Sequence, residues 1–567
     1  MDDPEIGPKC NIVVTQPRRI SAMSIAERVA SERCEPLGES VGYTVRLESA
    51  GCHKTQVRFV TPGILLRKFQ SDPSLADFTH IIIDEIHERD KNTEFFMIAL
   101  RKLLGRRNDL HVVLMSATLQ TEELLNFWRG VRSDEVPTMI EQNENFNPAE
   151  ISIPGRTFPV QSYFLEDILA MTKYVDDVET MSQSSPTNDT NYFDIEGMEN
   201  LSYESDSGET LRCFLCGRAD FNSPAELGLH ITLCDGEKKD INILTNESDH
   251  LFTSSDPVCD LDGESVLSDK ELLDRYNTIH DDEMIDLNLI LETLKHVEKS
   301  SKNDEAILVF LPGWQEISKL TRLLENSYPF NDILRFRVLP LHSGIPSRNQ
   351  KLVFQKTRKG VRKIILATNI AETSVTIDDV GYVIDTGKAK EKNYDPHIHS
   401  NTLLPMWISK ASVKQRKGRS GRTRPGVCYH LYSREQHASF RPFLESELLR
   451  SSLEEICLQC KKLNLAPGRE KDADGIPAFL EQAMSPPHPK SVGNALDLLV
   501  NLGAMEAETN NLTDLGNCLS MLSCEPRVGK MVIWSYIIGC AKVSCVCPQP
   551  SEKGEHTNCL FQFGITF

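Results

Sequence analysis

The chain has 567 residues, of which 40% are hydrophobic and 25% charged, so it is too long for one hydrophobic core and predicts three or four globular domains. Its net charge of -20 does not exclude a nucleic-acid partner, because local charge rather than total charge decides binding. Much of the acid lies in residues 176–286, whereas residues 410–424 are strongly basic. No signal peptide or bilayer-spanning run is recognisable, which predicts no membrane partner and an intracellular location, nucleus or cytoplasm. The 16 cysteines are scattered, which predicts reduced thiols.

The first part of the chain predicts alternating strands and helices. Ile12 to Thr15 predicts a short strand and Ile20 to Glu32 a helix, and Val57 to Thr61 predicts another strand. In HIIIDEIHERD, residues 80–90, three isoleucines predict a strand buried on both faces, and acid and imidazole groups follow at once. Such groups are expected where a parallel strand ends at a ligand crevice. A second apolar run, LHVVLMSATL at residues 110–119, ends in small hydroxyl residues.

Residues 175–286 change in character. Ser, Asn, Asp, Glu and Thr dominate and apolar periodicity is mostly lost, which predicts an acidic, largely disordered insertion that could also bind protein partners. Residues 210–236 carry a C-x2-C and H-x3-C layout with apolar residues between the pairs, which favours a structural Zn²⁺ site in a small zinc finger. The alternative is loose thiols in a disordered loop. The candidate ligands are Cys213, Cys216, His230 and Cys234.

A second α/β lobe is predicted after the insertion. Its buried strands are expected at Ala306 to Leu311, Val338 to Ser343, Lys363 to Thr368 and Val380 to Asp385. Beyond Leu431 the pattern becomes helical and amphipathic, whereas the last residues are rich in Pro, Cys and Gly and predict an unstructured tail.

Several segments, in this order, resemble motifs of the DEAH-box RNA helicases of superfamily 2. They are TQPRRISA (motif Ia, from Thr15), DEIH (motif II, from Asp84), SAT (motif III, from Ser116), FLPGWQEI (motif IV, from Phe310), ATNIAETSVTIDDV (motif V, from Ala367) and QRKGRSGR (motif VI, from Gln415).

The resemblance implies an α/β fold with two RecA-like lobes. It places an incomplete first lobe at residues 1–174, the insertion at 175–286, the second lobe at 287–435, a winged-helix-like domain at 436–505, the start of a helical ratchet domain at 506–545 and the tail at 546–567. The family's P-loop, GxxxxGK(S/T), and its closing oligonucleotide-binding (OB) fold are not found in the sequence. We therefore expect a fragment with impaired nucleotide binding.

The resemblance also implies catalytic roles. Asp84 would hold Mg²⁺ through water, Glu85 would orient and deprotonate the attacking water, and His87 would couple the nucleotide site to the second lobe. Gln415 would orient water, and Arg419 and Arg422 would be arginine fingers. The alternatives are a solvated acidic turn and, for Arg416 and Lys417, a nonspecific basic helix.

Two further groups of residues are implied. ATP would contact Arg28, Phe354, Asp378, Ser116 and Thr118. Alternatively, Arg28 is a salt-bridged helix arginine and Phe354 is a core residue. The alternative for the SAT segment is an ordinary turn capped by a hydroxyl group. RNA would contact Arg18, Arg19, Thr61, Gly63, Thr368, Asn369, Thr373 and Lys388.

The sequence thus predicts an ATP-dependent RNA helicase that couples NTP hydrolysis, with ATP and Mg²⁺, to 3'-to-5' movement along RNA and to unwinding. The alternative is a catalytically inactive RNA-binding or scaffold protein derived from a helicase.

Overall fold

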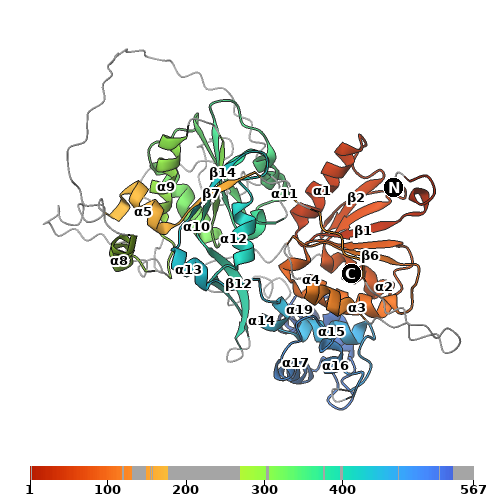
Figure 1. Ribbon diagram of the computed structural model, residues 1–567. Coiled ribbons are helices and arrows are strands. Elements are labelled where there is room, and N and C mark those ends of the chain that lie inside the picture. Colours follow the sequence, from red (N-terminus) through yellow and green to blue (C-terminus); the bar gives the residue numbers. More distant parts are fainter. Residues whose placement is uncertain are drawn as a thin grey trace, which may run out of the picture. The chain divides into compact units, whose positions relative to one another are not determined.

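The structure is a computed structural model (Figure 1) that describes residues 1, 3–117, 121–129, 148–153, 155, 158–175, 269–281, 283–301, 305–373, 377–395, 400–469, 472–522 and 524–539. Two compact units are present: the first combines Met1–Thr172 with Asp281–Phe567, and the second is Lys173–His280. The second unit contains helix α8 (Asp269–Ile279). The first unit holds both six-stranded sheets.

The first sheet has six strands in the order β3-β2-β4-β1-β5-β6, and all neighbours are parallel except β2 and β3. Ile81 and Ile83, on one face of β5, are almost fully buried, whereas Ile82 on the other face is half-buried, so the predicted full burial holds for one face only. Because parallel strands end at one edge, the residues after β1 and β5 meet there. The strands are β1 (Ile12–Thr15), β2 (Val41–Val45), β3 (Glu48–Ala50), β4 (Val57–Val60), β5 (His80–Ile83) and β6 (His111–Leu114).

The helices of the first lobe begin at recognisable signals. Pro62 occupies the first turn of α2, where a missing N–H costs nothing, and the Asp90 carboxylate caps α3 by accepting from the N–H groups of Asn92 and Thr93. The helices are α1 (Arg19–Glu32), α2 (Pro62–Ser71), α3 (Lys91–Leu104) and α4 (Thr121–Trp128), with 3-10 turns η1 (Gly7–Lys9) and η2 (Ile86–Glu88).

The second sheet also has six strands, all parallel, in the order β7-β14-β11-β8-β10-β9. The central strands are buried along their whole length, as their continuous apolar runs predict. The strands are β7 (Val160–Tyr163), β8 (Ala306–Phe310), β9 (Phe336–Leu341), β10 (Arg362–Ala367), β11 (Val380–Asp385) and β14 (Gly426–His430).

The position of β7 differs from the domain limits expected from the sequence. It precedes the insertion but pairs with β14, from Gly426 opposite Val160 to Tyr429 opposite Tyr163. The second sheet therefore recruits residues from before the insertion, and the expected lobe boundary at residue 174 does not coincide with the sheets. The physical reason is that strand pairing joins chain segments irrespective of their separation in sequence.

Helices and a long antiparallel hairpin complete the second lobe. The hairpin joins β12 (Lys388–Asp395) to β13 (Ser400–Trp407). The helices are α5 (Leu165–Thr172), α9 (Leu287–Ser300), α10 (Trp314–Asn326), α11 (Ser347–Gln350), α12 (Lys410–Lys417) and α13 (Arg434–Ser439), with 3-10 turns η4 (Lys351–Phe354) and η5 (Asn369–Ala371).

The C-terminal helices pack against the first lobe. Figure 1 shows the blue helices beside α3, and Phe95 of α3 meets Phe479 edge to face in one continuous hydrophobic core. These helices are α14 (Glu447–Arg450), α15 (Glu454–Lys462), α16 (Ile476–Leu480), α17 (Pro489–Asn501), α18 (Asp514–Met521) and α19 (Pro526–Ile537). Within the described residues, no helix has the length and apolar character needed to cross a membrane.

The predicted α/β class with two parallel-sheet lobes is confirmed. The winged-helix and ratchet assignments stay predictions. The zinc ligands Cys213, Cys216, His230 and Cys234 lie outside the described residues, as do most of the insertion and the predicted tail.

Candidate functional site

An acidic turn follows β5 at the edge of the first sheet. Asp84 accepts two hydrogen bonds, from the Gln16 side-chain amide at 2.6 Å and from the Glu85 N–H at 2.8 Å. Gln16 follows β1, the neighbouring strand, so two adjacent strand ends orient the same carboxylate. Glu85 has a φ of 54°, in the left-handed region that non-glycine residues seldom adopt. The turn is therefore held in a backbone conformation that local sequence preference does not favour.

The Glu85 carboxylate is unusually easy to protonate. Burial raises its pKa to about 7, with further increases from the nearby charges of Asp84 and Glu88, and Arg419 and Arg18 partly oppose this change. A carboxylate with a pKa near neutrality can accept a proton from water and release it again at physiological pH. This is the electrostatic environment that a general base requires.

His87 connects the acidic turn to two other segments. Its Nδ1 accepts from the Ala117 N–H at 3.3 Å, and its Nε2 lies 3.4 Å from the Glu85 carboxylate and 2.6 Å from the Gln415 side-chain amide. Burial lowers the pKa of His87, which favours the neutral imidazole. One imidazole therefore links the end of β5, the segment after β6 and helix α12 of the second lobe.

Two arginines of the second lobe interact electrostatically with this acidic turn. Arg419 is buried and donates to the main-chain carbonyl oxygens of Glu372 and Thr373, the latter at 2.8 Å. Burial and the charge of Arg422 lower the pKa of Arg419 to about 9, whereas Glu85 acts to raise it. Burial also lowers the pKa of Arg422, opposed by Asp378 and Glu85. The charges of both guanidinium groups therefore interact with the Glu85 carboxylate.

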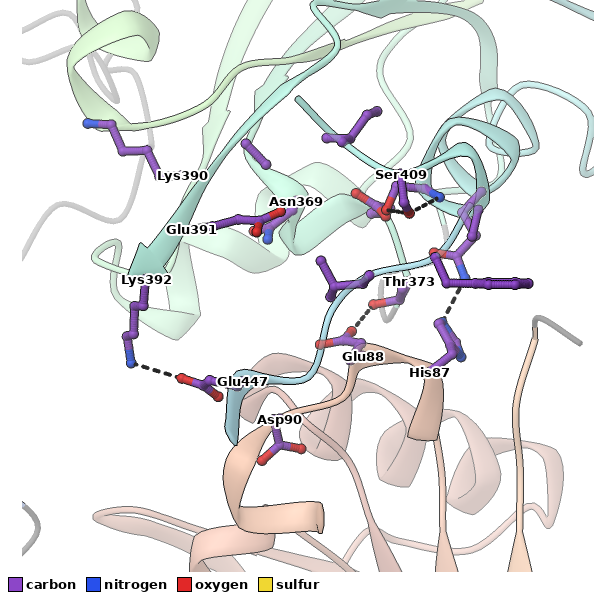
Figure 2. Close-up of a pocket in the computed structure, with 18 of the residues that line it drawn as sticks. His87, Glu88, Asp90, Asn369, Thr373, Lys390, Glu391, Lys392, Ser409 and Glu447 are labelled. Atoms are coloured by element: carbon purple, nitrogen blue, oxygen red, sulfur yellow. Dashed lines mark hydrogen bonds and ion pairs between the residues drawn. The ribbon is translucent and has the colours of Figure 1, made fainter. Parts of the chain in front are cut away.

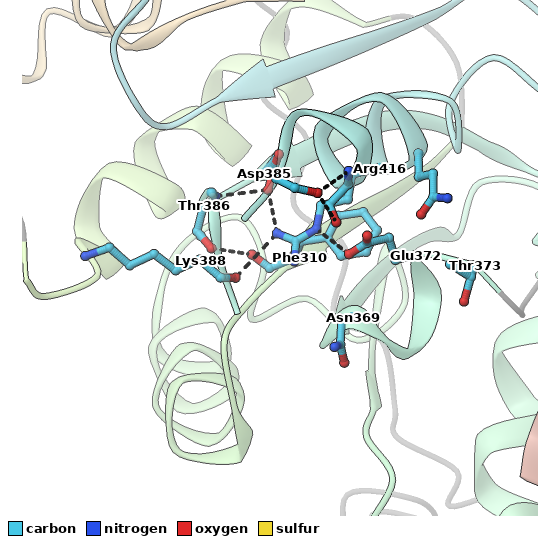
Figure 3. A network of polar contacts seen from close by, with 12 residues as sticks. Phe310, Asn369, Glu372, Thr373, Asp385, Thr386, Lys388 and Arg416 are labelled. Carbon is cyan, nitrogen blue, oxygen red and sulfur yellow. Dashed lines mark hydrogen bonds and ion pairs between the residues drawn. The ribbon is translucent and has the colours of Figure 1, made fainter. Parts of the chain in front are cut away.

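Arg416, one turn before Arg419, is fully buried between two carboxylates. Its guanidinium lies 2.7 Å from Asp385 and 3.0 Å from Glu372, and 4.8 Å above the ring of Phe310 (Figure 3). Burial alone would raise the pKa of Asp385, but Arg416 and His430 lower it below its usual range. This network fixes Glu372, whose carbonyl also holds Arg419. Arg416 is thus a structural residue, and the alternative of a nonspecific basic helix is wrong for it.

A cavity of about 260 Å³ lies beside the turn that carries Glu88. Figure 2 shows Glu88 and Thr373 next to one another in its wall, where the Thr373 hydroxyl donates a hydrogen bond to the Glu88 carboxylate. Arg18 reaches Asn369 at 3.3 Å and Glu88 at 3.5 Å. The cavity wall also carries Lys390, Lys392 and Arg450. Lys392 pairs with Glu447 at 3.6 Å and Arg450 with Glu391 at 3.7 Å, so carboxylates of the same wall offset part of this positive charge.

The predicted RNA residues are only partly gathered at this cavity. Arg18, Asn369 and Thr373 line it. Arg19 and Gly63 are exposed, Thr61 is half-buried before α2, and Thr368 is buried. Lys388 is buried with its ammonium 4.7 Å above the Trp407 ring, so its side chain is not offered to solvent, because an aromatic face within the second lobe stabilises the cation.

The predicted nucleotide residues are found on separate surface segments. Arg28 is exposed and paired with Glu32 at 2.5 Å, Phe354 is half-buried against the second core, and Asp378 and Ser116 are exposed. Thr118 lies outside the described residues. Sequence reasoning missed Gln16 and Glu88 as site residues. Gln16 could have been found because it follows a buried strand adjacent to β5, whereas nothing local marks Glu88.

Comparison with known proteins agrees with this geometry. Residues 5–127 match the DEAD/DEAH box helicase model, and residues 287–424 match the helicase conserved C-terminal domain. The DExH-box ATP-dependent RNA helicase DExH3 of Arabidopsis thaliana is 39% identical over 537 residues, covering 94% of this chain and 38% of that protein. The ATP-dependent DNA/RNA helicase DHX36 of Bos taurus is 38% identical over 544 residues, covering 94% of this chain and 46% of that protein.

The chain carries both domains of the DEAD/DEAH-box helicases, the DEAD/DEAH box domain and the helicase conserved C-terminal domain. It spans less than half the length of these relatives. The two matched segments contain the first sheet and most of the second, with the acidic turn in one and Arg419 and Arg422 in the other. The family predicted from the motifs is confirmed, and the roles of single residues stay predictions.

Proposed function

We propose that this chain is the catalytic part of an ATP-dependent RNA helicase. The observation that carries the proposal is that Glu85, with its pKa near 7, shares one electrostatic environment with Arg419 and Arg422 of the other lobe. Hydrolysis of a nucleoside triphosphate needs a carboxylate that accepts a proton from water and cations that neutralise the phosphoryl group. Glu85 and the two arginines could supply these groups.

In this proposal the protein groups act in sequence. Glu85 accepts a proton from the attacking water, and His87 and Gln415 keep the two lobes aligned around it. Arg419 and Arg422 neutralise charge that develops on the transferred phosphoryl group, which lowers the barrier because a buried cation interacts strongly with it. Movement of Arg419 is transmitted to Thr373, since Arg419 donates to its carbonyl. Nucleotide state and cavity shape are thereby coupled.

The donor set beside Asp84 fits a hydrated Mg²⁺ that accompanies ATP. Asp84 and Glu85 supply carboxylates, and among the described residues the buried Gln16 Oε1 and Thr15 Oγ1 have no hydrogen-bond partner. Hard divalent cations prefer such oxygen ligands. When bound, Mg²⁺ would supply positive charge to the phosphates, and Asp84 would hold it through water.

RNA is the proposed occupant of the cavity lined by Arg18, Asn369 and Thr373. A guanidinium, an amide and a hydroxyl suit phosphate and ribose oxygens, and Lys390 adds a positive charge. The 3'-to-5' direction of movement is part of the proposal and comes from the family resemblance.

The test is ATP turnover by this 567-residue chain with and without single-stranded RNA, together with RNA binding measured by fluorescence anisotropy. We expect RNA to accelerate hydrolysis, with a high KM for ATP because the sequence contains no P-loop motif to bind the phosphates. Arg18→Ala should weaken RNA binding by about tenfold, the loss of roughly one charge-assisted hydrogen bond, whereas the exposed Lys54→Ala should leave it unchanged. RNA binding without any turnover would instead support the RNA-binding or scaffold alternative.

We further propose that Cys213, Cys216, His230 and Cys234 hold a structural Zn²⁺, supported by their spacing in the sequence. Metal analysis of the purified chain should give one zinc per molecule, and the double change Cys213→Ser and Cys216→Ser should remove it because two of four ligands are lost. Retention of zinc by that variant would exclude this site. Cys34→Ser and Cys52→Ser, at two exposed thiols of the first lobe, are the matched control. Binding of protein partners through the insertion stays a prediction.

A further inference from the structure

Lys363 is a buried lysine that no part of the proposed mechanism uses. It lies in β10 with 1% of its surface exposed. Its ammonium donates to the carbonyl oxygens of Val353 at 3.0 Å and Gln355 at 3.1 Å, and lies 2.7 Å from the Asp379 carboxylate. An ammonium has three protons, so these three acceptors satisfy it completely. Because all three N–H groups of this buried ammonium are bonded, Lys363 holds each of the three acceptors in place.

The three acceptors belong to two separate surface segments. Val353 and Gln355 flank Phe354 at the end of η4, so Lys363 holds the main chain on both sides of that ring. Asp379 follows Asp378 in the turn before β11. One cation therefore ties together a segment that presents an aromatic ring and a segment that presents a carboxylate.

Both segments face charged groups of the proposed nucleotide site. Lys351 of η4 pairs with Glu27 of α1, and Arg28 is the next residue of that helix. The hydrogen bond from Arg28 to Glu32 raises the pKa of Arg28, and Asp378 adds to this increase. Asp378 likewise acts to raise the pKa of Arg422. The η4 segment is therefore tied to α1 next to Arg28, and Asp378 interacts electrostatically with Arg28 and Arg422.

We propose that Lys363 is a positioning residue for the nucleotide base, because it fixes the main chain at Phe354 and, through Asp379, the turn of Asp378. The inference rests on the proposed function and concerns one part of it, the base rather than the triphosphate. Removing the ammonium leaves two carbonyls and a carboxylate without their partner, so η4 shifts and the ring no longer packs against a base. Affinity for the phosphates, which Arg419 and Arg422 contact, is preserved.

The experiment compares ATP with inorganic tripolyphosphate, which has the phosphates but no base. The measured quantity is the ratio of the inhibition constant of tripolyphosphate to the KM for ATP. Lys363→Met should lower this ratio by about tenfold, the loss of roughly one base-aromatic stacking contact. The change should appear in KM rather than kcat. Lys356→Met, at an exposed lysine of the same loop, is the matched control and should leave the ratio unchanged.

A double-mutant cycle with Phe354→Ala separates positioning from general damage. If Lys363 acts through Phe354, the double variant should have the same ratio as Phe354→Ala alone, and Lys363→Arg should recover part of the loss. The inference would be overturned if the fold-changes of the two single variants multiplied in the double variant. An unchanged ratio in Lys363→Met would also overturn it.

Two controls keep the result interpretable. If Lys363→Met fails to fold, Asp379→Asn removes the ion pair while both carbonyl acceptors remain, and it must lower the ratio by about threefold, less than the full stacking loss. No change in Asp379→Asn would then refute the inference. Failure of the unaltered chain to bind ATP would overturn the proposed function and this inference together, whereas normal turnover with an unchanged ratio would overturn only the inference.

Discussion

Glu85→Gln is expected to reduce kcat for ATP hydrolysis by about a hundredfold to ten-thousandfold, the usual contribution of a general base. Glutamine keeps the size and hydrogen-bonding shape of the side chain but cannot accept a proton. RNA binding should remain, because Glu85 is not among the residues that line the cavity. Steady-state hydrolysis at saturating RNA measures the loss, and the exposed Glu122→Gln in α4 is the matched control.

The pH dependence gives a second readout of the same group. Because the pKa of Glu85 is raised to about 7, the carboxylate is protonated and inactive at pH 6 and ionised at pH 8. The kcat/KM of the unaltered chain, which reports the free protein, should therefore rise with pH through about 7 and then level off. Glu85→Gln should have no such step. A pH step of the same size in the variant would assign the titration to another group.

Arg416→Met is expected to destabilise the second lobe by about 3–5 kcal/mol, because Asp385 and Glu372 would be left as buried carboxylates without their cation. The midpoint of the thermal transition that includes this lobe should fall by about 10 °C. Differential scanning calorimetry or circular dichroism would measure it. Arg419 should also lose its position, since the Glu372 carbonyl that holds it moves with the network.

Arg424→Met is the matched control for that prediction. Arg424 is an arginine of the same segment, about half exposed and 3.0 Å from Glu305, and removal of a surface ion pair of this kind changes stability by less than about 1 kcal/mol. A similar fall in the two midpoints would mean that the buried network does not carry the stability assigned to it. In that case water would have to reach the Asp385 carboxylate.

The sequence was most informative where strands end. A continuous apolar run followed by polar residues predicts a buried parallel strand and its crevice, and HIIIDEIHERD has this form. The acidic turn was therefore located correctly, and so were the central strands of both sheets. The ordered motifs added the second lobe and its arginines.

The same reasoning could not predict contacts between residues that are distant in the sequence. Val160–Tyr163 is a short run that gives no sign of which sheet it joins, and only its pairing with β14 decides this. Arg416 and Arg419 are both arginines of one basic segment, yet the first is enclosed by carboxylates and the second by main-chain carbonyls. Lys388 was expected at RNA from the family resemblance, but its side chain is buried against Trp407. Each outcome depends on residues far away in the sequence.

Two residues of the acidic turn, Glu85 and Arg89, have φ angles of 54° and 53°, and neither is glycine. An L-residue in this region costs roughly 1 kcal/mol or more relative to an ordinary backbone. Directed evolution for heat resistance alone is therefore expected to enrich glycine at position 85, since glycine adopts this angle freely. We expect such variants to be more stable but unable to hydrolyse ATP, because glycine has no carboxylate to replace the proposed proton acceptor.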